Sequence, residues 1–117
     1  MTASNILVFK GDKEALKQQV ISAGGLVCVD FHASWCPSCR RFAQMLPDIA
    51  NAHPSVLFLK ADVDDAKDLA ATYLISSIPH IKFFRYNETT TNLDELGSVT
   101  GANKGLIIDE LKKHTTA

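Results

Sequence analysis

Short apolar runs alternate with segments of helical periodicity along this chain of 117 residues. Four apolar runs are too short to be helices and predict buried strands, at residues 6–9, 26–31, 56–59 and 81–84. The run at 26–31 is apolar at nearly every position, which is typical of a central strand in a parallel sheet that is covered on both faces. We therefore expect a sheet with this segment at its centre.

The segments between these runs have the periodicity of helices. Apolar spacing and capping residues predict helices at residues 12–22, 37–52 and 65–73, and from 103 onward. Pro47 lies inside the second helix, and we expect it to kink or interrupt that helix because proline removes a ladder hydrogen bond. Residues 87–92 are expected to form a polar loop, and 95–100 to pair with the preceding strand as a hairpin.

The resulting element order is βαβαβαββα. Alternation of strands and helices predicts an α/β fold with a parallel sheet, and the late pair of strands adds an antiparallel edge. Helices would cover both faces. The length is sufficient for one compact domain with a real core, which we expect to span residues 1–117.

Composition excludes several classes of function. The formal net charge is −1, which argues against binding to nucleic acid or to a membrane surface. No apolar run approaches the ~20 residues that cross a bilayer. The first ten residues lack a basic segment followed by an apolar stretch, so we expect no secretory signal. Three cysteines do not suggest an extracellular disulfide framework, and a redox protein of the cytoplasm fits best.

Cys36 and Cys39 carry the clearest chemical signal. They lie three positions apart at the expected start of a helix, about one turn from each other, so their sulfurs can form a small disulfide. Unpaired N–H groups and the helix dipole favour a thiolate at the first of them, and thiolate is the reactive form. We predict a site of dithiol–disulfide exchange in which Cys36 is the nucleophile. Cys39 should be more buried and should resolve the mixed disulfide.

Asp30 is the second candidate, because a carboxylate at the end of an apolar strand is costly to bury as an anion. Burial would raise its pKa, and the carboxylate could then take a proton from Cys39, directly or through water. A capping or solvent-reaching carboxylate is the alternative. Lys60 ends the neighbouring strand and either adjusts the charge of Asp30 or lies exposed on the surface. Cys28, in the middle of a buried strand, is expected to be a small core residue.

Several motifs at matching distances make the chain resemble the thioredoxin family from about residue 6 to residue 113. They are Val29-Asp30-Phe31, Trp35-Cys36-x-x-Cys39, Lys60, Asp62 to Asp64, Tyr73, Ile78-Pro79 and Val99-x-Gly101. The resemblance implies a thioredoxin fold and a protein disulfide reductase.

The resemblance also implies the details of the site. Pro79 would follow a cis bond and pack against the disulfide, with the backbone of Ile78 turned toward a substrate strand. Trp35, Ile78, Pro79 and Gly101 would line a shallow apolar groove for protein targets. The family needs no tightly bound cofactor beyond the reversible Cys36–Cys39 disulfide. An NADPH-dependent flavoprotein thioredoxin reductase would supply electrons to a monomer.

The sequence departs from the usual family pattern close to the cysteines. Pro37 and Ser38 stand where Gly-Pro is usual, and the loop at 86–95 looks several residues longer. His32 replaces an aromatic residue and His80 replaces a threonine. A protonated histidine near Cys36 would stabilise its thiolate, although substitution tolerated at a surface rim is an equal alternative. We expect Pro37, Ser38, Lys60, His32 and His80 to modulate the redox potential.

Other classes of function remain open from the sequence. Cys36, Cys39, His32 and His80 could form a Cys₂His₂ zinc site, although the paired ligand set of most structural zinc motifs is missing. A scaffold protein with the thioredoxin fold and no catalytic activity is another alternative. The intact cysteine pair disfavours it. An oxidant or isomerase would have a shifted potential. The string Trp-Cys-Pro-x-Cys-Arg is also similar to tryparedoxins and nucleoredoxins.

Overall fold

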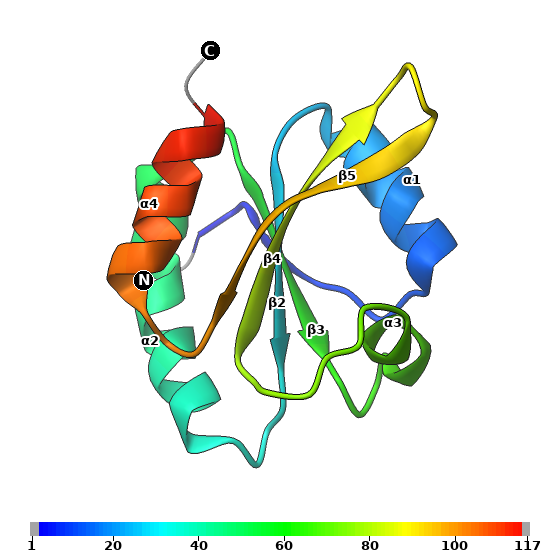
Figure 1. Ribbon diagram of the computed structural model, residues 1–117. Coiled ribbons are helices and arrows are strands. Elements are labelled where there is room, and N and C mark those ends of the chain that lie inside the picture. Colours follow the sequence, from blue (N-terminus) through cyan, green and yellow to red (C-terminus); the bar gives the residue numbers. More distant parts are fainter. Residues whose placement is uncertain (1–2, 116–117) are drawn as a thin grey trace.

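The computed structural model describes residues 3–115 of the chain (Figure 1). Its elements are β1 (Ile6–Val8), α1 (Lys13–Ala23), β2 (Val27–His32), α2 (Pro37–Ala52), β3 (Leu57–Asp62), α3 (Lys67–Thr72), β4 (His80–Asn87), β5 (Asn92–Thr100) and α4 (Lys104–Thr115). The predicted order βαβαβαββα is confirmed. Residues 1–2 and 116–117 of the domain expected at 1–117 lie outside the described residues, and its extent stays a prediction.

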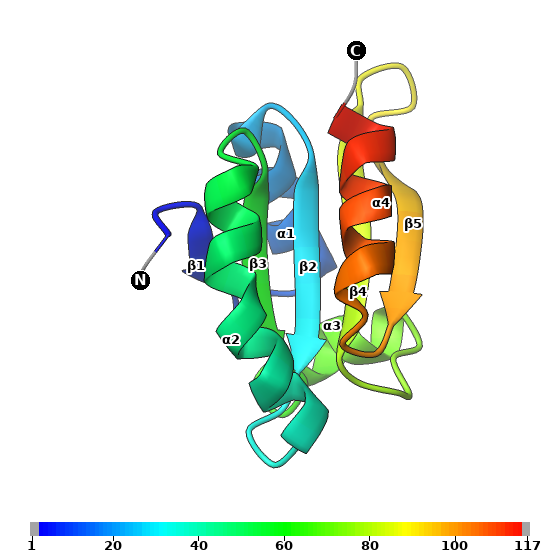
Figure 2. The same ribbon diagram turned by 90° about the vertical axis from the view of Figure 1, so that its left-hand side faces the viewer.

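The five strands form one mixed sheet in the order β1-β3-β2-β4-β5. β3 runs parallel to both β1 and β2, whereas β4 is antiparallel to both β2 and β5. Helices α2 and α4 cover one face, and α1 and α3 cover the other (Figures 1 and 2). The predicted central position of the uniformly apolar strand, β2, is confirmed.

Alternation along β2 distributes its side chains between two cores. Val27 and Val29 belong to the cluster under α1 and α3, whereas Cys28 belongs to the cluster under α2 and α4 and is a buried core residue as predicted. Successive side chains of a strand point to opposite faces. Asp30 therefore lies on the same face as Cys28, toward α2, and this alternation delivers a carboxyl group to the helix that carries the cysteines.

Pro47 does not interrupt α2, so that part of the sequence prediction is wrong. The helix continues as one element from Pro37 to Ala52. Proline removes one hydrogen bond, but most helical stability in proteins comes from the packing of an apolar face. Phe42, Leu46 and Ile49 provide that face and are all buried in the core.

The loop expected at 86–95 is mostly strand. β4 runs to Asn87 and β5 begins at Asn92, so only residues 88–91 form the turn. The Asn87 Oδ1 atom accepts hydrogen bonds from the N–H groups of Thr89 and Thr90, which is the local chemistry of an Asx turn. The strands of the β4–β5 hairpin are thus longer than expected. The residues at their ends are polar, so the sequence pattern did not indicate strand there.

Within residues 3–115, no helix has both the length and the apolar character that crossing a membrane requires.

Candidate active site

The cysteine pair sits at the first turn of α2. Cys36 is the N-cap, and its sulfur accepts a hydrogen bond from the Cys39 N–H at 3.2 Å. Pro37 occupies the first turn, where a missing N–H costs no helical hydrogen bond. Cys36 and Cys39 form a disulfide with their Cα atoms 5.2 Å apart. The predicted contact between the two sulfurs is therefore confirmed, at a helix end that favours a thiolate on Cys36.

The two cysteines are equally buried, at 4% and 5% exposed, so the expectation of a more buried Cys39 is wrong. Ala33, Val63 and Ile78 pack around the pair and cover Cys36 as well. The Ser38 Oγ atom lies 3.4 Å from the Cys36 sulfur. In the reduced protein this hydroxyl can donate to the thiolate, which a proline at the same position cannot do.

The segment between α3 and β4 ends at Pro79 and lies against the cysteine pair. The Ile78–Pro79 peptide bond is cis, as the resemblance implied, and the Ile78 carbonyl oxygen is 3.7 Å from the Cys36 sulfur. The Pro79 carbonyl accepts a hydrogen bond from the Gly101 N–H at 2.8 Å. Gly101 has φ +93°, a left-handed conformation that favours glycine. Of the predicted groove residues, Ile78 thus contacts Cys36 directly, and Gly101 is hydrogen-bonded to Pro79, the next residue along the chain.

Trp35 is 64% exposed. Its indole N–H donates to the Asp64 carboxylate at 2.9 Å. Arg40 donates from Nη1 to the Ser34 carbonyl at 2.9 Å and so braces the same loop. Neither of these two contacts was predicted from the sequence. For Asp64 the signal was its place within a family motif, and for Arg40 it was the position directly after Cys39.

Asp30 is 3% exposed, and its Oδ1 atom has no hydrogen-bond partner among the described residues. Burial raises the pKa of this carboxyl to about 7, although the positive charge of Lys60 opposes the rise. Asp30 and Lys60 are register partners on β2 and β3, which places the lysine beside the carboxyl, one of the two alternatives that the sequence left open. At neutral pH the group is therefore close to half ionised and can both accept and release a proton.

Both histidines near the site have a pKa below the ordinary value, which favours the neutral ring. Burial and then the charge of Lys60 lower the pKa of His32, with a smaller opposing effect from acidic neighbours that include its register partner Asp62. Burial and then Lys82 lower the pKa of His80, which also contacts the Ser98 hydroxyl. The surroundings of both residues therefore disfavour the positive charge that the sequence suggested.

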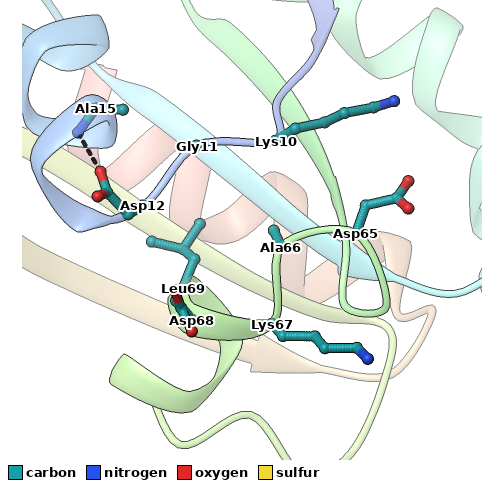
Figure 3. A pocket seen from close by; sticks show the side chains of 9 residues that line it. All are labelled: Lys10, Gly11, Asp12, Ala15, Asp65, Ala66, Lys67, Asp68 and Leu69. Atoms are coloured by element: carbon teal, nitrogen blue, oxygen red, sulfur yellow. Dashed lines mark hydrogen bonds between the residues drawn. The ribbon is translucent and has the colours of Figure 1, made fainter.

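No group of three or more His, Cys, Asp or Glu side chains within residues 3–115 is placed to hold a metal ion. A cavity of about 420 Å³ lies between the start of α1 and the start of α3, with Asp12, Asp65 and Lys67 in its wall (Figure 3). None of the residues that line it belongs to the predicted site. The cysteine pair with its covering segments is therefore the chemical centre that the described residues support.

Known proteins share this arrangement. The thioredoxin family model matches residues 7–113. The chain is 30% identical over 105 residues to the thioredoxin of Ophiophagus hannah, covering 89% of this chain and 94% of that protein. It is 34% identical over 104 residues to the TPR repeat-containing thioredoxin TDX of Arabidopsis thaliana, covering 89% of this chain but only 26% of that longer protein.

A solved structure, the thioredoxin of Trichomonas vaginalis, superimposes with a TM-score of 0.87 at 38% identity. The superposition covers 95% of this chain and 98% of that one. The family, the fold and the cysteine pair agree, and they do not favour a zinc module, a scaffold or an oxidant. The chain therefore belongs to the thioredoxin family and is a thiol–disulfide oxidoreductase, a protein disulfide reductase.

Proposed function

We propose that this protein reduces disulfides of other proteins in the cytoplasm and regains its electrons from an NADPH-dependent flavoprotein thioredoxin reductase. The observation that carries the proposal is the Cys36–Cys39 disulfide at the N-terminus of α2, bordered by the Ile78 carbonyl. Localisation in the cytoplasm is supported by the cysteine content, because reducing compartments keep thiols such as that of Cys28 free.

Reduction begins at Cys36. Its thiolate attacks one sulfur of the target disulfide, a mixed disulfide forms, and the other target sulfur leaves as a thiolate. The helix N-terminus, the Cys39 N–H and the Ser38 hydroxyl stabilise the attacking thiolate. The exposed Trp35 and the Ile78 backbone flank the point of attack, so a target strand can lie across this surface.

Release of the target needs a second thiolate at Cys39. The Asp30 carboxylate, on the face of the sheet that carries α2, takes the Cys39 proton directly or through water. The Cys39 thiolate attacks the Cys36 sulfur, the Cys36–Cys39 disulfide forms, and the second target thiolate leaves. The target has then gained two electrons and two protons, and the enzyme has lost them. The reductase returns both to the enzyme disulfide.

Reduction of insulin disulfides, with dithiothreitol as the electron source, tests the proposal. We expect wild-type protein to accelerate the reaction, and Cys36→Ser to reduce it to the uncatalysed rate. Cys39→Ser should accumulate a mixed disulfide with the target, because the resolving thiol is missing. Equal rates for wild type and Cys36→Ser would exclude the assigned nucleophile.

The electron donor and the direction are tested separately. NADPH oxidation with a flavoprotein thioredoxin reductase should depend on this protein, and reduced glutathione should replace that system poorly. The potential of the Cys36–Cys39 couple, titrated with glutathione, gives the direction, because a tenfold change in equilibrium corresponds to ~30 mV. A potential well above that of the glutathione pool would show an oxidant. Subcellular fractionation tests the cytoplasmic location.

A further inference from the structure

Leu74 occupies an unusual backbone position at the end of α3. Tyr73 is the C-cap, the Leu74 N–H donates to the Ala71 carbonyl at 3.1 Å, and the Ile75 N–H donates to the Ala70 carbonyl at 2.9 Å. These two bonds define a Schellman motif, in which the residue after the cap is usually glycine because it takes the left-handed conformation. Leu74 takes that conformation, with φ +54°.

Leucine is unfavourable at this position for two independent reasons. The left-handed region brings the Cβ atom of an L-residue too close to the backbone carbonyl that follows. The side chain is also 85% exposed, the largest fraction among the exposed large apolar side chains within residues 3–115. Packing inside the fold therefore offsets neither cost. A residue that destabilises the fold in both its backbone and its side chain points to a role outside the fold.

The position of Leu74 connects it to the cysteine site. It lies four residues before Ile78, whose carbonyl faces Cys36, so the chain can separate their Cα atoms by at most about 14 Å. The β2–α2 loop and the α3–β4 segment lie at the same, lower end of the molecule in both views (Figures 1 and 2). A typical interface covers about 800 Å² of each partner, which corresponds to a disc of about 16 Å radius. A protein docked on Cys36 can therefore extend toward Leu74.

The same segment also indicates the chemistry of the partner. Residues 73–79 contain no charged side chain, and Trp35 provides a second exposed apolar side chain at this end. Charged residues are depleted and apolar residues retained at the core of protein interfaces. The segment that carries Leu74 is thus suited to an apolar patch of a protein, while the carboxylate of Asp64 lies beside Trp35.

We propose that Leu74 is a specificity-determining contact for the proteins whose disulfides this enzyme reduces. Its side chain packs on an apolar surface next to the target disulfide, while Ile78 and Trp35 contact the residues that flank the attacked sulfur. The proposal rests on protein disulfide reduction as the function. Small disulfides, which are too short to reach Leu74, gain nothing from this contact.

Thr91 offers a matched control. It is the other non-glycine residue with a left-handed backbone within residues 3–115, at φ +56°, and it lies in the β4–β5 turn at the opposite end of the molecule. Leu74→Gly and Thr91→Gly each replace a strained residue by glycine. Both should raise the thermal midpoint by roughly 4 °C, since a stabilisation of this kind moves the midpoint of a small domain by several degrees.

Activity separates the two variants. With insulin and dithiothreitol, we expect Leu74→Gly to lower kcat/KM roughly fivefold through a higher KM, the scale of losing one interface contact. Thr91→Gly should match wild type. Leu74→Met, which keeps a long apolar side chain and the strain, should restore most of the loss. With the small disulfide 5,5′-dithiobis(2-nitrobenzoate), all three variants should match wild type.

The outcomes distinguish the claims. A more stable Leu74→Gly with unchanged kcat/KM for insulin would overturn the role of Leu74. An equal loss with the small disulfide would also overturn it, since the effect would then act on the cysteines. A loss seen only when the flavoprotein reductase supplies electrons would assign Leu74 to the donor and not to the target. Failure of wild type itself to reduce insulin would instead refute the proposed function.

Discussion

Asp30 and Lys82 are the two charged residues that the structure buries within residues 3–115, and their surroundings are opposite. They lie on neighbouring strands, because Asp30 pairs with Ile81 and Lys82 pairs with Val29. Lys82 points to the face of the sheet under α1 and α3 and forms a salt bridge with Glu95 at 3.0 Å. Asp30 faces α2, with an oxygen that has no hydrogen-bond partner there.

The difference separates a structural charge from a chemical one. A buried charge with a partner is consistent with a role in the fold alone. A buried carboxyl without one costs stability whenever it ionises, so the fold gains nothing from keeping it. Its position beside the cysteine helix gives it a chemical use instead. The predictions below test this contrast by removing one charge or one partner at a time.

Asp30→Asn should have the largest effect, in opposite directions on stability and on activity. The carboxyl has a pKa of about 7 when folded and about 3.9 when unfolded, so between pH 4 and 7 the folded state binds a proton that the unfolded state does not. The free energy of unfolding of the wild type therefore falls as the pH rises through this window, by about 1.4 kcal/mol per pH unit and about 4 kcal/mol in total. Asparagine does not ionise, so Asp30→Asn removes this fall in the free energy of unfolding.

Urea unfolding at pH 4, 6 and 8 measures the effect. Asp30→Asn and wild type should be about equal at pH 4, and the variant should be more stable at pH 8 by up to about 4 kcal/mol. Its insulin reduction should fall at least tenfold, because the amide cannot accept the Cys39 proton. Asp109→Asn, on the exposed side of α4, should change neither quantity. A variant that is less stable than wild type at pH 8 would contradict the account of Asp30.

Glu95→Gln tests the paired charge and should have a smaller effect. It leaves Lys82 buried without a counter-charge, which destabilises the protein. Because Glu95 is 44% exposed, solvent limits the cost, and we expect about 1–2 kcal/mol in urea unfolding. Lys82→Met in the Glu95→Gln background should recover most of it. Insulin reduction should stay at the wild-type rate in all these variants, and a clear loss would place the pair in the catalytic machinery.

Sequence reasoning found one of these charges and not the other, for a physical reason. Both are single charges in apolar runs, but Asp30 precedes a cysteine pair, whereas the partner of Lys82 lies across a hairpin. The ladder between β4 and β5 is irregular at Phe83 and Phe84, so the register that brings Glu95 to Lys82 cannot be counted from the sequence. Local patterns predicted the order of the elements, and only three-dimensional packing fixed this pairing.

The same limit applies around the active site. Spacing predicted the contact between Cys36 and Cys39, because one helical turn determines it. The charge state of His32 depends on its burial and on Lys60 of another strand, which the sequence does not reveal. The backbone conformation and the exposure of Leu74 likewise depend on how the C-terminal end of α3 folds, and no sequence pattern indicates them.

Lys60→Met should have the smallest effect and sharpens the contrast most directly, because it removes a positive charge that opposes the raised pKa of Asp30. The pKa of Asp30 should rise further. A higher pH is then needed to ionise the carboxyl, which must be ionised to accept the Cys39 proton. At pH 7 we expect insulin reduction to fall roughly two- to threefold, since less of the carboxyl is ionised, and to recover near pH 8.5. The pH–rate profile of insulin reduction measures the shift.

Lys60 also lowers the pKa of His32, so the assignment needs a second background. In Asp30→Asn the group that Lys60 acts on is gone, and adding Lys60→Met should no longer move the remaining pH profile. A shift that persisted there would mean that His32 is the titrating group. A shift that vanished would show that Lys60 acts through Asp30, so that this lysine tunes the unpaired carboxyl without neutralising it, unlike Glu95 opposite Lys82.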